Sequence, residues 1–390
     1  RISVVRSGER YAMIYLDNAA TTKMSQACAQ LYMQYAVEDF YNPSAPYRPA
    51  LECANAIKQA RETIAQTLGA TADEIYFTAS GSEADNIALL CAIKAKRGNV
   101  LIGSSEHSAV YETSKELERR GYAVRYVPCD GYGRTDLQAL RDLADEETVL
   151  VSVMHACNET GAINDLDQIV KIVRARSPQA IVHSDGVQAF GKIPVRVKTS
   201  GVDLYSVSAH KIHGPKGIGA LYCRKGLFLR PFVFGGGQEK NVRSATENVG
   251  AIAAFAHAAQ ECAHTLRERY RHASACKNAL IEQLRACPIP IRILSPEDGS
   301  PYIVMLAARN ARGEVVAHAM QDRGVLIGTG SACATHKATK RIPSALGLDA
   351  AWADGIVRVS FCEQTTLDDV QACAQALKES LAFTAGIQRS

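Results

Sequence analysis

The stretch Ser206-Val-Ser-Ala-His-Lys-Ile-His-Gly-Pro-Lys-Gly217 constrains the fold and the chemistry of this chain more than any other. A short β-rich run, Leu204–Val207, leads into it, and Lys211 follows that run at the start of a turn rich in glycine and proline. A lysine can hold an aldehyde as a Schiff base only where it is partly desolvated and can lose its proton. Ser208 and His210 supply hydroxyl and imidazole donors of the kind that a phosphate needs. Taken alone, a lysine beside such a turn is more often a solvated surface residue.

The segments on either side of this stretch alternate between two patterns. Short apolar, β-rich runs predict strands at Ile75–Thr78, Val100–Gly103, Ala123–Val127, Val149–Val153, Ala180–His183, Leu204–Val207 and Gly219–Tyr222. Helix-patterned segments lie between several of them, at Glu83–Lys96, Val110–Arg120 and Leu166–Ala175. Because strands that alternate with helices form βαβ units, the sequence predicts an α/β fold with a mainly parallel sheet covered by helices.

A second body is predicted towards the C-terminus. A long helical stretch, Val249–Ala286, follows the glycine-rich segment Gly235–Gly237, and its length suggests a connector between two bodies. After it come a strand-like, a helix-like and another strand-like segment, at Tyr302–Leu306, Glu314–Gln321 and Ile356–Phe361. Thr366, with Asp369 three residues later, is expected to cap a last helix. These patterns predict a smaller α+β domain.

The expected domain boundaries follow from these two bodies. Residues 26–262 are expected to form the large domain, and residues 13–25 and 263–390 the small one. Residues 1–12 mix charges with short apolar stretches and lack the continuous apolar core of a signal peptide. Met13 opens Met-Ile-Tyr-Leu-Asp, which is typical of a natural start, so residues 1–12 are expected to be an upstream extension or a cloning remnant.

The composition is that of an ordinary soluble globular protein. Of the 390 residues, 47% are hydrophobic and 22% charged, and the net charge is only +4. A charge this small gives no reason to expect a surface for nucleic acid or for an anionic membrane. The apolar runs are shorter than the roughly 18–20 residues that span a bilayer.

The cysteines indicate a reduced protein. The chain has 12 cysteines, none of them in a C-x-x-C pair, so zinc ribbons and iron–sulfur ligation lack support and no metal site is expected. Most of them sit among Ala, Leu and Val, where a free cysteine behaves as a small core residue. A cytoplasmic location is therefore expected.

An aspartate near the end of a predicted strand has the chemistry of a cofactor ligand. Asp185 lies in Val182-His-Ser-Asp-Gly-Val-Gln188, about one βα unit before Lys211. A carboxylate beside a pyridine nitrogen keeps that nitrogen protonated, and protonation makes the ring an electron sink. The carboxyl ends of strands are where open α/β sheets bind ligands. In isolation, an aspartate that caps a turn is the commoner case.

A strand-to-helix junction supplies a candidate phosphate site. In Phe77-Thr-Ala-Ser-Gly-Ser-Glu-Ala-Asp-Asn86, a strand passes through small residues into a helix, whose free amides and dipole favour an anion. Gly81 allows close backbone approach, and Ser82 is expected to provide both a helix cap and a hydroxyl. By itself, a plain helix cap is the favoured interpretation.

Together these elements resemble the class V aminotransferase superfamily, which has fold type I of the pyridoxal-phosphate enzymes. Within it, the chain is similar to the NifS/IscS-like group I cysteine desulfurases. The resemblance runs from Tyr15 to Arg358. The further matching segments are Tyr15–Thr22, Asn42–Ser44, Ser105–His107, Asn158–Gly161, Gly235–Glu239 and Arg243–Asn248. It implies a large domain with a mainly parallel seven-stranded sheet, a smaller α+β domain, and pyridoxal 5'-phosphate as the cofactor.

The resemblance also implies roles for residues around the cofactor. Lys211 would form the Schiff base, Asp185 would pair with the pyridine nitrogen, and His107 would stack on the ring. Gln188 and Asn158 would lie near the phenolic oxygen. The phosphate would be held by Gly81, Ser82, Ser208 and His210.

For the substrate and the assembly, the resemblance implies three further roles. Arg358 would bind the substrate carboxylate, which suits guanidinium geometry, with assistance from Asn42. Thr246 would reach the phosphate of the other subunit, so a homodimer with shared sites is expected.

One cysteine differs from the others in its surroundings. Cys333 lies in Gly328-Thr-Gly-Ser-Ala-Cys-Ala-Thr335, whose glycines and small polar residues predict a loop. A thiolate is the competent nucleophile, so a reactive cysteine must be accessible. The resemblance makes Cys333 the persulfide-forming residue. It would take sulfur from L-cysteine, leave L-alanine, and pass the sulfur to an acceptor such as an iron–sulfur scaffold or a tRNA-thiolating enzyme.

Some positions depart from the usual family pattern, and two other functions stay open. The departures are Tyr47, Ala79, Cys157, Asn164 and Ala245, which put the shape of the substrate pocket in doubt but not the reaction class. A selenocysteine lyase on the same scaffold would use the same site. A catalytically inactive scaffold subunit for sulfur-carrier proteins is disfavoured, because the chain retains the lysine, aspartate, histidine, arginine and cysteine. An ordinary transaminase would have no need of a loop thiol.

Overall fold

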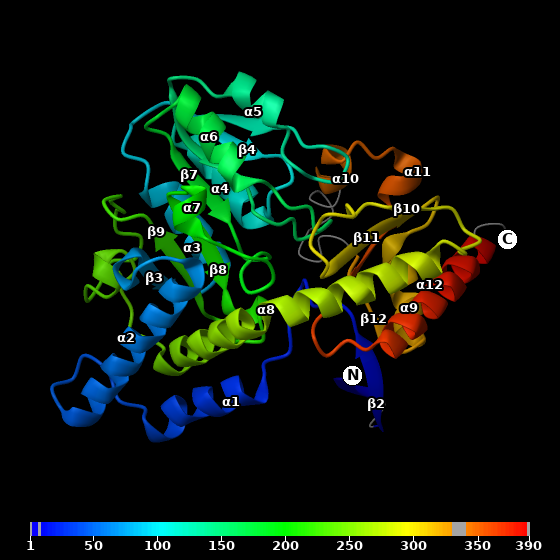
Figure 1. The fold of residues 1–390 in the computed structure, drawn as a ribbon, viewed down its shortest axis with the longest axis horizontal. Helices are drawn as coiled ribbons and strands as arrows, with labels where there is room; N and C mark the ends of the chain where they lie inside the picture. The colour runs from blue at the N-terminus through cyan, green and yellow to red at the C-terminus, as the bar shows by residue number, and fades with distance from the viewer. Residues whose placement is uncertain (1, 7–8, 330–340, 388–390) are drawn as a thin grey trace.

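The computed structural model describes residues 2–6, 9–329 and 341–387, so Cys333 lies outside the described residues. The central feature is a sheet of seven strands in the order β3-β9-β8-β7-β6-β4-β5 (Figure 1). These are β3 (Ile75–Thr78), β4 (Asn99–Gly103), β5 (Ala123–Val127), β6 (Thr148–Ser152), β7 (Ile181–Asp185), β8 (Leu204–Ser208) and β9 (Gly219–Cys223). All neighbouring pairs are parallel except those of β9, which runs antiparallel to β3 and β8. The predicted mainly parallel sheet is confirmed.

Helices connect the parallel strands and cover the sheet. They are α3 (Gly81–Cys91), α4 (Ser108–Arg119), α5 (Leu137–Leu143), α6 (Leu166–Arg176) and α7 (Val197–Ser200). Residues of β4, β8 and β9 are buried throughout, which fits strands that are covered on both faces. The helix expected over Glu83–Lys96 ends earlier, at Cys91. Arg230 donates hydrogen bonds to carbonyl groups at this helix end. Its backbone N–H donates to Cys91 O and its guanidinium donates to Ile93 O.

The start of α3 corrects one expectation about its cap. Ser80, not Ser82, is the N-cap residue: its backbone is extended and its side chain accepts a hydrogen bond of 3.0 Å from the Glu83 N–H. Ser82 lies two residues further on, as the second residue of α3, where the backbone is already helical. Its hydroxyl therefore remains available at the helix N-terminus.

Two smaller sheets lie at the other end of the molecule. One contains β10 (Ile291–Ile293), β11 (Ile303–Ala308) and β13 (Ile356–Ser360), all antiparallel. The other contains β1 (Ile2–Arg6), β2 (Glu9–Tyr15) and β12 (Val325–Leu326). The helices here are α9 (Gly313–Asp322), α10 (Arg341–Ala345), α11 (Ala350–Ala353) and α12 (Leu367–Ile387). The predicted cap of the last helix is confirmed, since Thr366 and Asp369 each accept the other's backbone N–H at 3.1 Å.

A single long helix, α8 (Val249–Leu284), connects the two ends of the molecule (Figure 1). It contacts α1 (Gln26–Met33) and α2 (Arg48–Leu68) near one end and α12 near the other. The short helical segments are η1 (Gln34–Glu38), η2 (Ala72–Glu74), η3 (Ala209–Lys211) and η4 (Glu239–Asn241). The large sheet and the small antiparallel sheet each have their own apolar core. This arrangement agrees with a connector between two bodies, and the exact domain boundaries stay a prediction.

The N-terminal boundary expected at Met13 falls inside a strand. Met13 is part of β2 and pairs with Ile2 in a β1–β2 hairpin, while the next two residues of β2 pair with β12. Whether residues 1–12 are an extension stays a prediction.

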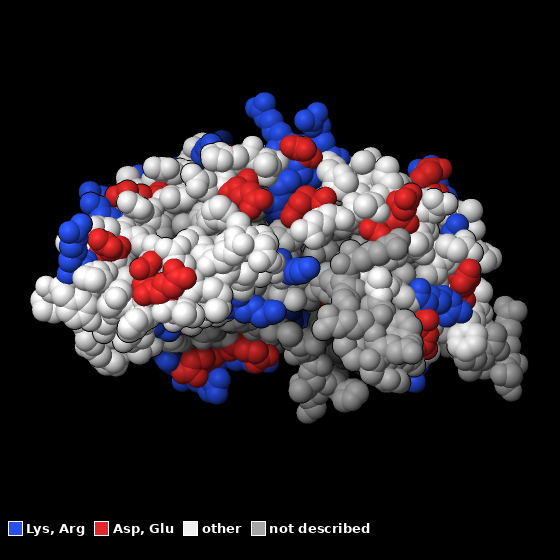
Figure 2. Space-filling view, turned by 90° about the horizontal axis from the view of Figure 1, so that it is seen from below, with Lys and Arg blue, Asp and Glu red and all other residues white. Residues whose placement is uncertain are grey.

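Surface and cysteine features agree with the composition. Lys and Arg are interspersed with Asp and Glu over the face seen from below (Figure 2). Among the described cysteines, eight are buried and three are half-buried, and none forms a disulfide. Within the described ranges, the helices are too short or too polar to cross a membrane.

Candidate active site

A cavity of about 290 Å³ opens at the carboxyl ends of the parallel strands. Ten of the residues that the sequence singled out line it together: Gly81, Ser82, His107, Asn158, Asp185, Gln188, Ser208, His210, Lys211 and Arg358. They come from strand ends, from the N-terminus of α3, and from β13 of the second body. The sheet brings the first nine together because all its strands except β9 end at the same edge.

Lys211 sits in the turn that follows β8. Its Nζ donates to Ala19 O at 2.8 Å and to Ala20 O at 2.7 Å, so the segment after β2 holds the amine. The residue is half-buried and faces the cavity. Its amine is therefore placed at a partly desolvated site, which is the condition for Schiff-base chemistry.

Asp185 ends β7 deep in the cavity. Its Oδ1 accepts the Val187 N–H at 2.9 Å, and the residue is buried. Burial raises the pKa of Asp185, while the charges of His107 and Lys211 oppose that rise. A cation placed against this carboxylate would favour its ionised form.

A second buried carboxyl beside Asp185 was missed by the sequence analysis. Asp85, on α3, is buried; burial first, and then the charge of Asp185, raises its pKa well above the usual value. His183 lies next to it, with Nε2 3.5 Å from Asp85 Oδ1, and burial lowers the pKa of His183 to about 3. The signal existed, because Asp85 follows Gly81 by four residues and so shares its helix face.

His107 is oriented by the helix that follows it. Its Nδ1 accepts the Ala109 N–H at 3.1 Å, which leaves the proton of the neutral ring on Nε2. Burial lowers the pKa of His107, although Asp185 pulls in the other direction. The ring is thus a neutral, oriented group at the cavity wall.

The opposite end of the cavity is built for an anion. Gly81 and Ser82 open α3, and Ser208 ends β8 across from them. A Cβ at Gly81 would lie 2.7 Å from Val187 Cγ2, so a larger residue at this position would force Val187 to shift. Burial, followed by the charge of Lys211, lowers the pKa of His210 to about 3, which leaves a neutral donor. These donors together with the helix dipole favour a phosphate.

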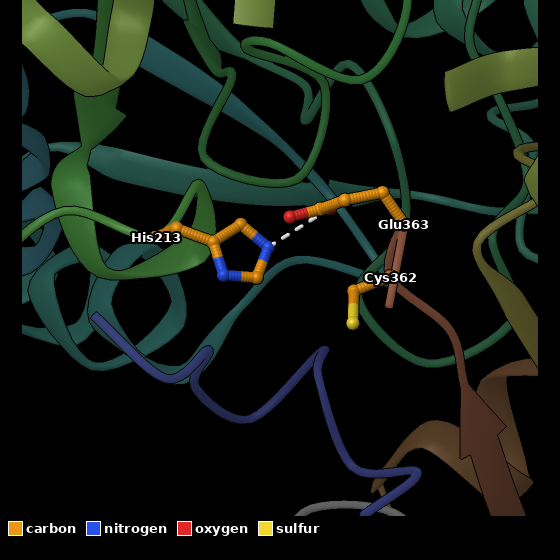
Figure 3. A group of neighbouring side chains, drawn as sticks. All are labelled: His213, Cys362 and Glu363. Carbon is orange, nitrogen blue, oxygen red and sulfur yellow. Dashed lines mark ion pairs between the residues drawn. The ribbon is translucent and has the colours of Figure 1, made fainter. Parts of the chain in front are cut away.

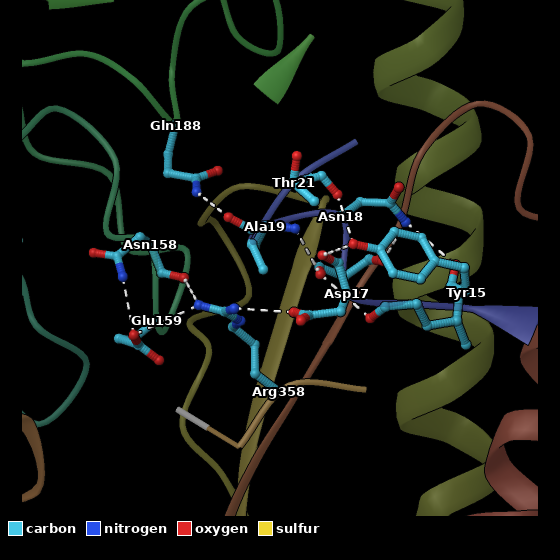
Figure 4. Close-up of polar contacts among 12 residues, drawn as sticks. Tyr15, Asp17, Asn18, Ala19, Thr21, Asn158, Glu159, Gln188 and Arg358 are labelled. Carbon is cyan, nitrogen blue, oxygen red and sulfur yellow. Dashed lines mark hydrogen bonds and ion pairs between the residues drawn. The ribbon is translucent and has the colours of Figure 1, made fainter. Parts of the chain in front are cut away.

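Arg358 reaches the cavity from β13 (Figure 4). Its guanidinium donates to Asn158 O at 2.8 Å and to Asp17 Oδ1 at 3.0 Å, and Glu159 Oε1 lies 3.5 Å from it. Burial opposes the charge of Arg358, but Glu159 and Asp17 outweigh it and raise the pKa. Arg358 is only 3% exposed, but it therefore keeps the positive charge that an anionic ligand needs. Asp17 and Glu159 were not predicted as site residues.

Two predicted site residues lie elsewhere. Asn42 and Thr246 line a separate hollow, away from the cavity of the same chain, and both are exposed. Asn42 Oδ1 accepts the Ser44 N–H at 2.9 Å, so its carbonyl is engaged locally. A third predicted residue, Cys333, lies outside the described residues.

A separate cluster joins the loop after Lys211 to the segment after β13 (Figure 3). His213, Cys362 and Glu363 are close enough to suggest ligands of an ion. However, His213 Nε2 lies 3.1 Å from Glu363 Oε2, and Arg269 lies 2.9 Å from the same oxygen. His213 Nδ1 also lies 2.9 Å from the carbonyl oxygen of Lys23. The side chains of His213 and Arg269 thus already contact the Glu363 carboxylate, which does not need an ion to pair with it.

This cluster predicts acid sensitivity. Burial alone would raise the pKa of Glu363, but the hydrogen bond and charge of His213 and the charge of Arg269 lower it to about 2. A carboxyl with a depressed folded pKa stabilises the protein above its unfolded pKa of about 4.3, and this contribution is lost as pH falls towards 2. The wild-type melting temperature should fall as the pH is lowered from about 4.3 to 2. In the Glu363→Gln variant, we expect a smaller fall over the same pH range.

The control is Glu268→Gln, which changes an exposed carboxylate of α8. Melting temperatures measured across the window check the expectation. A Glu363→Gln profile with the same slope as that of the wild type would contradict it.

Comparison with known proteins agrees with this geometry. Residues 14–373 match the Aminotransferase class-V family. A NifS/IcsS protein homolog of Lactobacillus delbrueckii subsp. bulgaricus is 39% identical over 374 residues, which cover 94% of this chain and 97% of that protein. A cysteine desulfurase of Trichormus azollae is 34% identical over 375 residues, covering 94% of this chain and 92% of that protein. A solved structure of a NifS-like protein has a TM-score of 0.89 and 33% identity, covering 95% of this chain and all, 100%, of that one.

The fold and the cavity define a pyridoxal-phosphate enzyme of the class V aminotransferase family. Within that family, the chain belongs to the NifS/IscS-like cysteine desulfurases. The residues present fit the cofactor: the Lys211 amine, the buried Asp185 carboxylate, and the donors at the N-terminus of α3, where a Cβ at Gly81 would crowd Val187.

Proposed function

We propose that this protein is a cysteine desulfurase, which converts L-cysteine to L-alanine and carries the sulfur as a persulfide on Cys333. The observation that carries the proposal is one cavity that combines Lys211 and Asp185 with Arg358 across from them. Lysine and aspartate serve a pyridoxal cofactor, whereas the arginine serves a substrate carboxylate. The names of the relatives point to the same reaction.

Each of these residues would do one task. Asp185 would hold the proton on the pyridine nitrogen, and the donors at Gly81, Ser208 and His210 would hold the phosphate. When bound, the cofactor supplies an electron sink for the pair released at the substrate's Cα. Lys211 would bind the cofactor and then move the proton from Cα, a task worth about 10²–10⁴-fold in rate.

Arg358 would orient the substrate. Asp17 and Glu159 hold its guanidinium in the cavity wall, and its Nε makes no hydrogen bond to the described residues. A bound carboxylate would add to this ion-pair network, in which Arg358 keeps its charge. Because a guanidinium binds a carboxylate with two parallel hydrogen bonds, it fixes the amino acid's direction.

Cys333 would accept the sulfur. Its thiolate attacks the substrate sulfur, a new S–S bond forms, the Cβ–S bond breaks, and its electron pair remains on the carbon skeleton. Protonation of that skeleton gives L-alanine, so one cysteine plus one enzyme thiol yields one alanine plus one enzyme persulfide. A sulfur-acceptor protein, such as an iron–sulfur scaffold or a tRNA-thiolating enzyme, would then take the terminal sulfur, and we place this reaction in the cytoplasm.

The direct test measures alanine released from L-cysteine by the purified protein, with and without a thiol reductant as acceptor. The proposal is supported if the protein releases about one alanine per active site without reductant and many alanines per site with it. Absence of alanine from the cofactor-loaded protein contradicts it.

We further propose that the enzyme is a homodimer in which Thr246 completes the partner's site. Thr246 lies outside its own chain's cavity and lines a hollow together with Phe40, which is 66% exposed, while Val37 of the nearby η1 is 61% exposed. Exposed apolar groups of this size favour a protein interface. A two-fold axis would let each subunit serve the other's phosphate.

Complementation tests the shared site. A Lys211→Ala chain and a Thr246→Val chain are each expected to lose most activity, because every site in either homodimer carries a defect. In the mixed dimer one site carries both defects and the other carries neither. Activity should therefore reappear when the two chains are mixed. If the mixture is no more active than its parents, Thr246 does not act across subunits.

A further inference from the structure

Lys192 is a buried cation to which no task above has been assigned. It lies in the turn after β7 and is only 4% exposed. Its Nζ donates to Gln188 Oε1 at 2.8 Å and lies 5.9 Å from the centre of the Tyr302 ring. Burying an ammonium group is costly unless its surroundings compensate. A lysine at this position therefore needs a reason beyond filling space.

Lys192 fixes the orientation of the Gln188 amide. An amide can be turned by 180° with little change in shape, so its partners decide which end faces which way. The amino group of Lys192 donates to Oε1, and Gln188 Nε2 therefore points the other way and donates to Ala19 O at 2.8 Å (Figure 4). Because Ala19 O can only accept, both partners select the same orientation.

The Gln188 amide is in turn connected to Lys211. Ala19 O also accepts from Lys211 Nζ at 2.8 Å, so two donors share one carbonyl. A continuous path of hydrogen bonds runs from Lys192 through Gln188 and Ala19 to Lys211. Gln188 also lines the cavity, and its amide direction decides whether a donor or an acceptor is presented there.

The charge of Lys192 is sensitive to pH near neutrality. Burial, followed by the positive charges of Lys211, Arg269 and Arg358, lowers the pKa of Lys192 to about 7, while Cys262 acts in the opposite direction. The neutral amine still donates to Gln188, but the positive charge near Lys211 is lost. A cation nearby disfavours a second cation, so this charge acts on the Lys211 nitrogen.

We propose that Lys192 is a positioning residue, which holds the Gln188 amide in one orientation and places a positive charge near Lys211. The inference rests on the proposed function in one respect, namely that Lys211 holds the cofactor.

Two substitutions separate the hydrogen bond from the charge. Lys192→Met removes both, whereas Lys192→Gln keeps an N–H donor but no charge. Two measurements are made on the purified proteins: the dissociation constant of pyridoxal 5'-phosphate, and the visible absorbance of the bound cofactor from about pH 5.5 to 8.5. Lys171→Met, at an exposed position of α6, is the control, and melting temperatures of the cofactor-free proteins report folding.

In the methionine variant, we expect cofactor binding about tenfold weaker, as for one lost oriented hydrogen bond. In the wild type, the visible absorbance of the bound cofactor should change near neutral pH, where Lys192 loses its charge. In the methionine variant this change should disappear. The glutamine variant should bind within about threefold of the wild type but also lack that absorbance change. Wild-type affinity together with a wild-type pH profile in the methionine variant would overturn the proposal.

If Lys192→Met does not fold, the glutamine variant decides, and an unchanged pH profile there overturns the proposal. A wild type that takes up no cofactor on Lys211 would instead overturn the proposed function.

Discussion

Replacing Cys333 with serine is expected to lower alanine release from L-cysteine by about 10³-fold or more, because a hydroxyl cannot replace a thiolate as the sulfur acceptor. Cofactor binding should be unchanged, since Lys211 and the anion site remain. Substrate should still alter the absorbance of the bound cofactor because Arg358 is intact. Turnover and absorbance measured on the same preparation separate lost chemistry from lost binding.

The matched control is Cys287→Ser, which changes a half-buried cysteine between α8 and β10. It should keep wild-type turnover. If the Cys333→Ser protein still releases alanine at the wild-type rate, Cys333 does not accept the sulfur, and the assignments of Lys211 and Arg358 would stand.

Replacing Lys211 with alanine is expected to have an effect at least as large, with turnover falling by about 10⁴-fold or more. This residue would both bind the cofactor and move the Cα proton, so two tasks are lost at once. The amine is also held by Ala19 O and Ala20 O, so a smaller side chain leaves those carbonyls without this donor.

Chemical labelling tests the same assignment without relying on activity. Borohydride reduction of the wild-type protein followed by peptide mapping should place the pyridoxyl group on Lys211. The control is Lys216→Ala, which changes an exposed lysine of the same stretch and should leave the label in place. A label found on any other lysine would refute the assignment.

Local sequence patterns determined the parts of the fold that depend on neighbours in the chain. The seven strands of the large sheet lie within one or two residues of their predicted positions, because alternating β-rich and helical runs define βαβ units. The last helix begins at the cap that Thr366 and Asp369 predicted. Asp185 ends β7 and Lys211 follows β8, and parallel neighbouring strands bring such ends together.

Resemblance to a family added roles that these patterns do not carry. Periodicity alone gave no role to His107, Arg358 or Thr246, whereas the family's motifs assigned one to each. The tertiary structure then separated these residues. His107 and Arg358 line the cavity, but Thr246 lies outside it in the same chain.

Only the tertiary structure decided which buried charges meet. Arg358 pairs with Asp17 across 341 positions of the chain. Ala19 O accepts from Lys211 across 192 positions and from Gln188 across 169. No local pattern encodes such a pair, because neither residue affects the backbone preferences of the other. The N-cap of α3 is Ser80 and not Ser82, because the backbone is still extended at Ser80 as the chain leaves β3. The sequence thus specified the helices, the strands and the residue types at their ends. The folded chain decided which of those side chains form ion pairs and which donate to the same carbonyl.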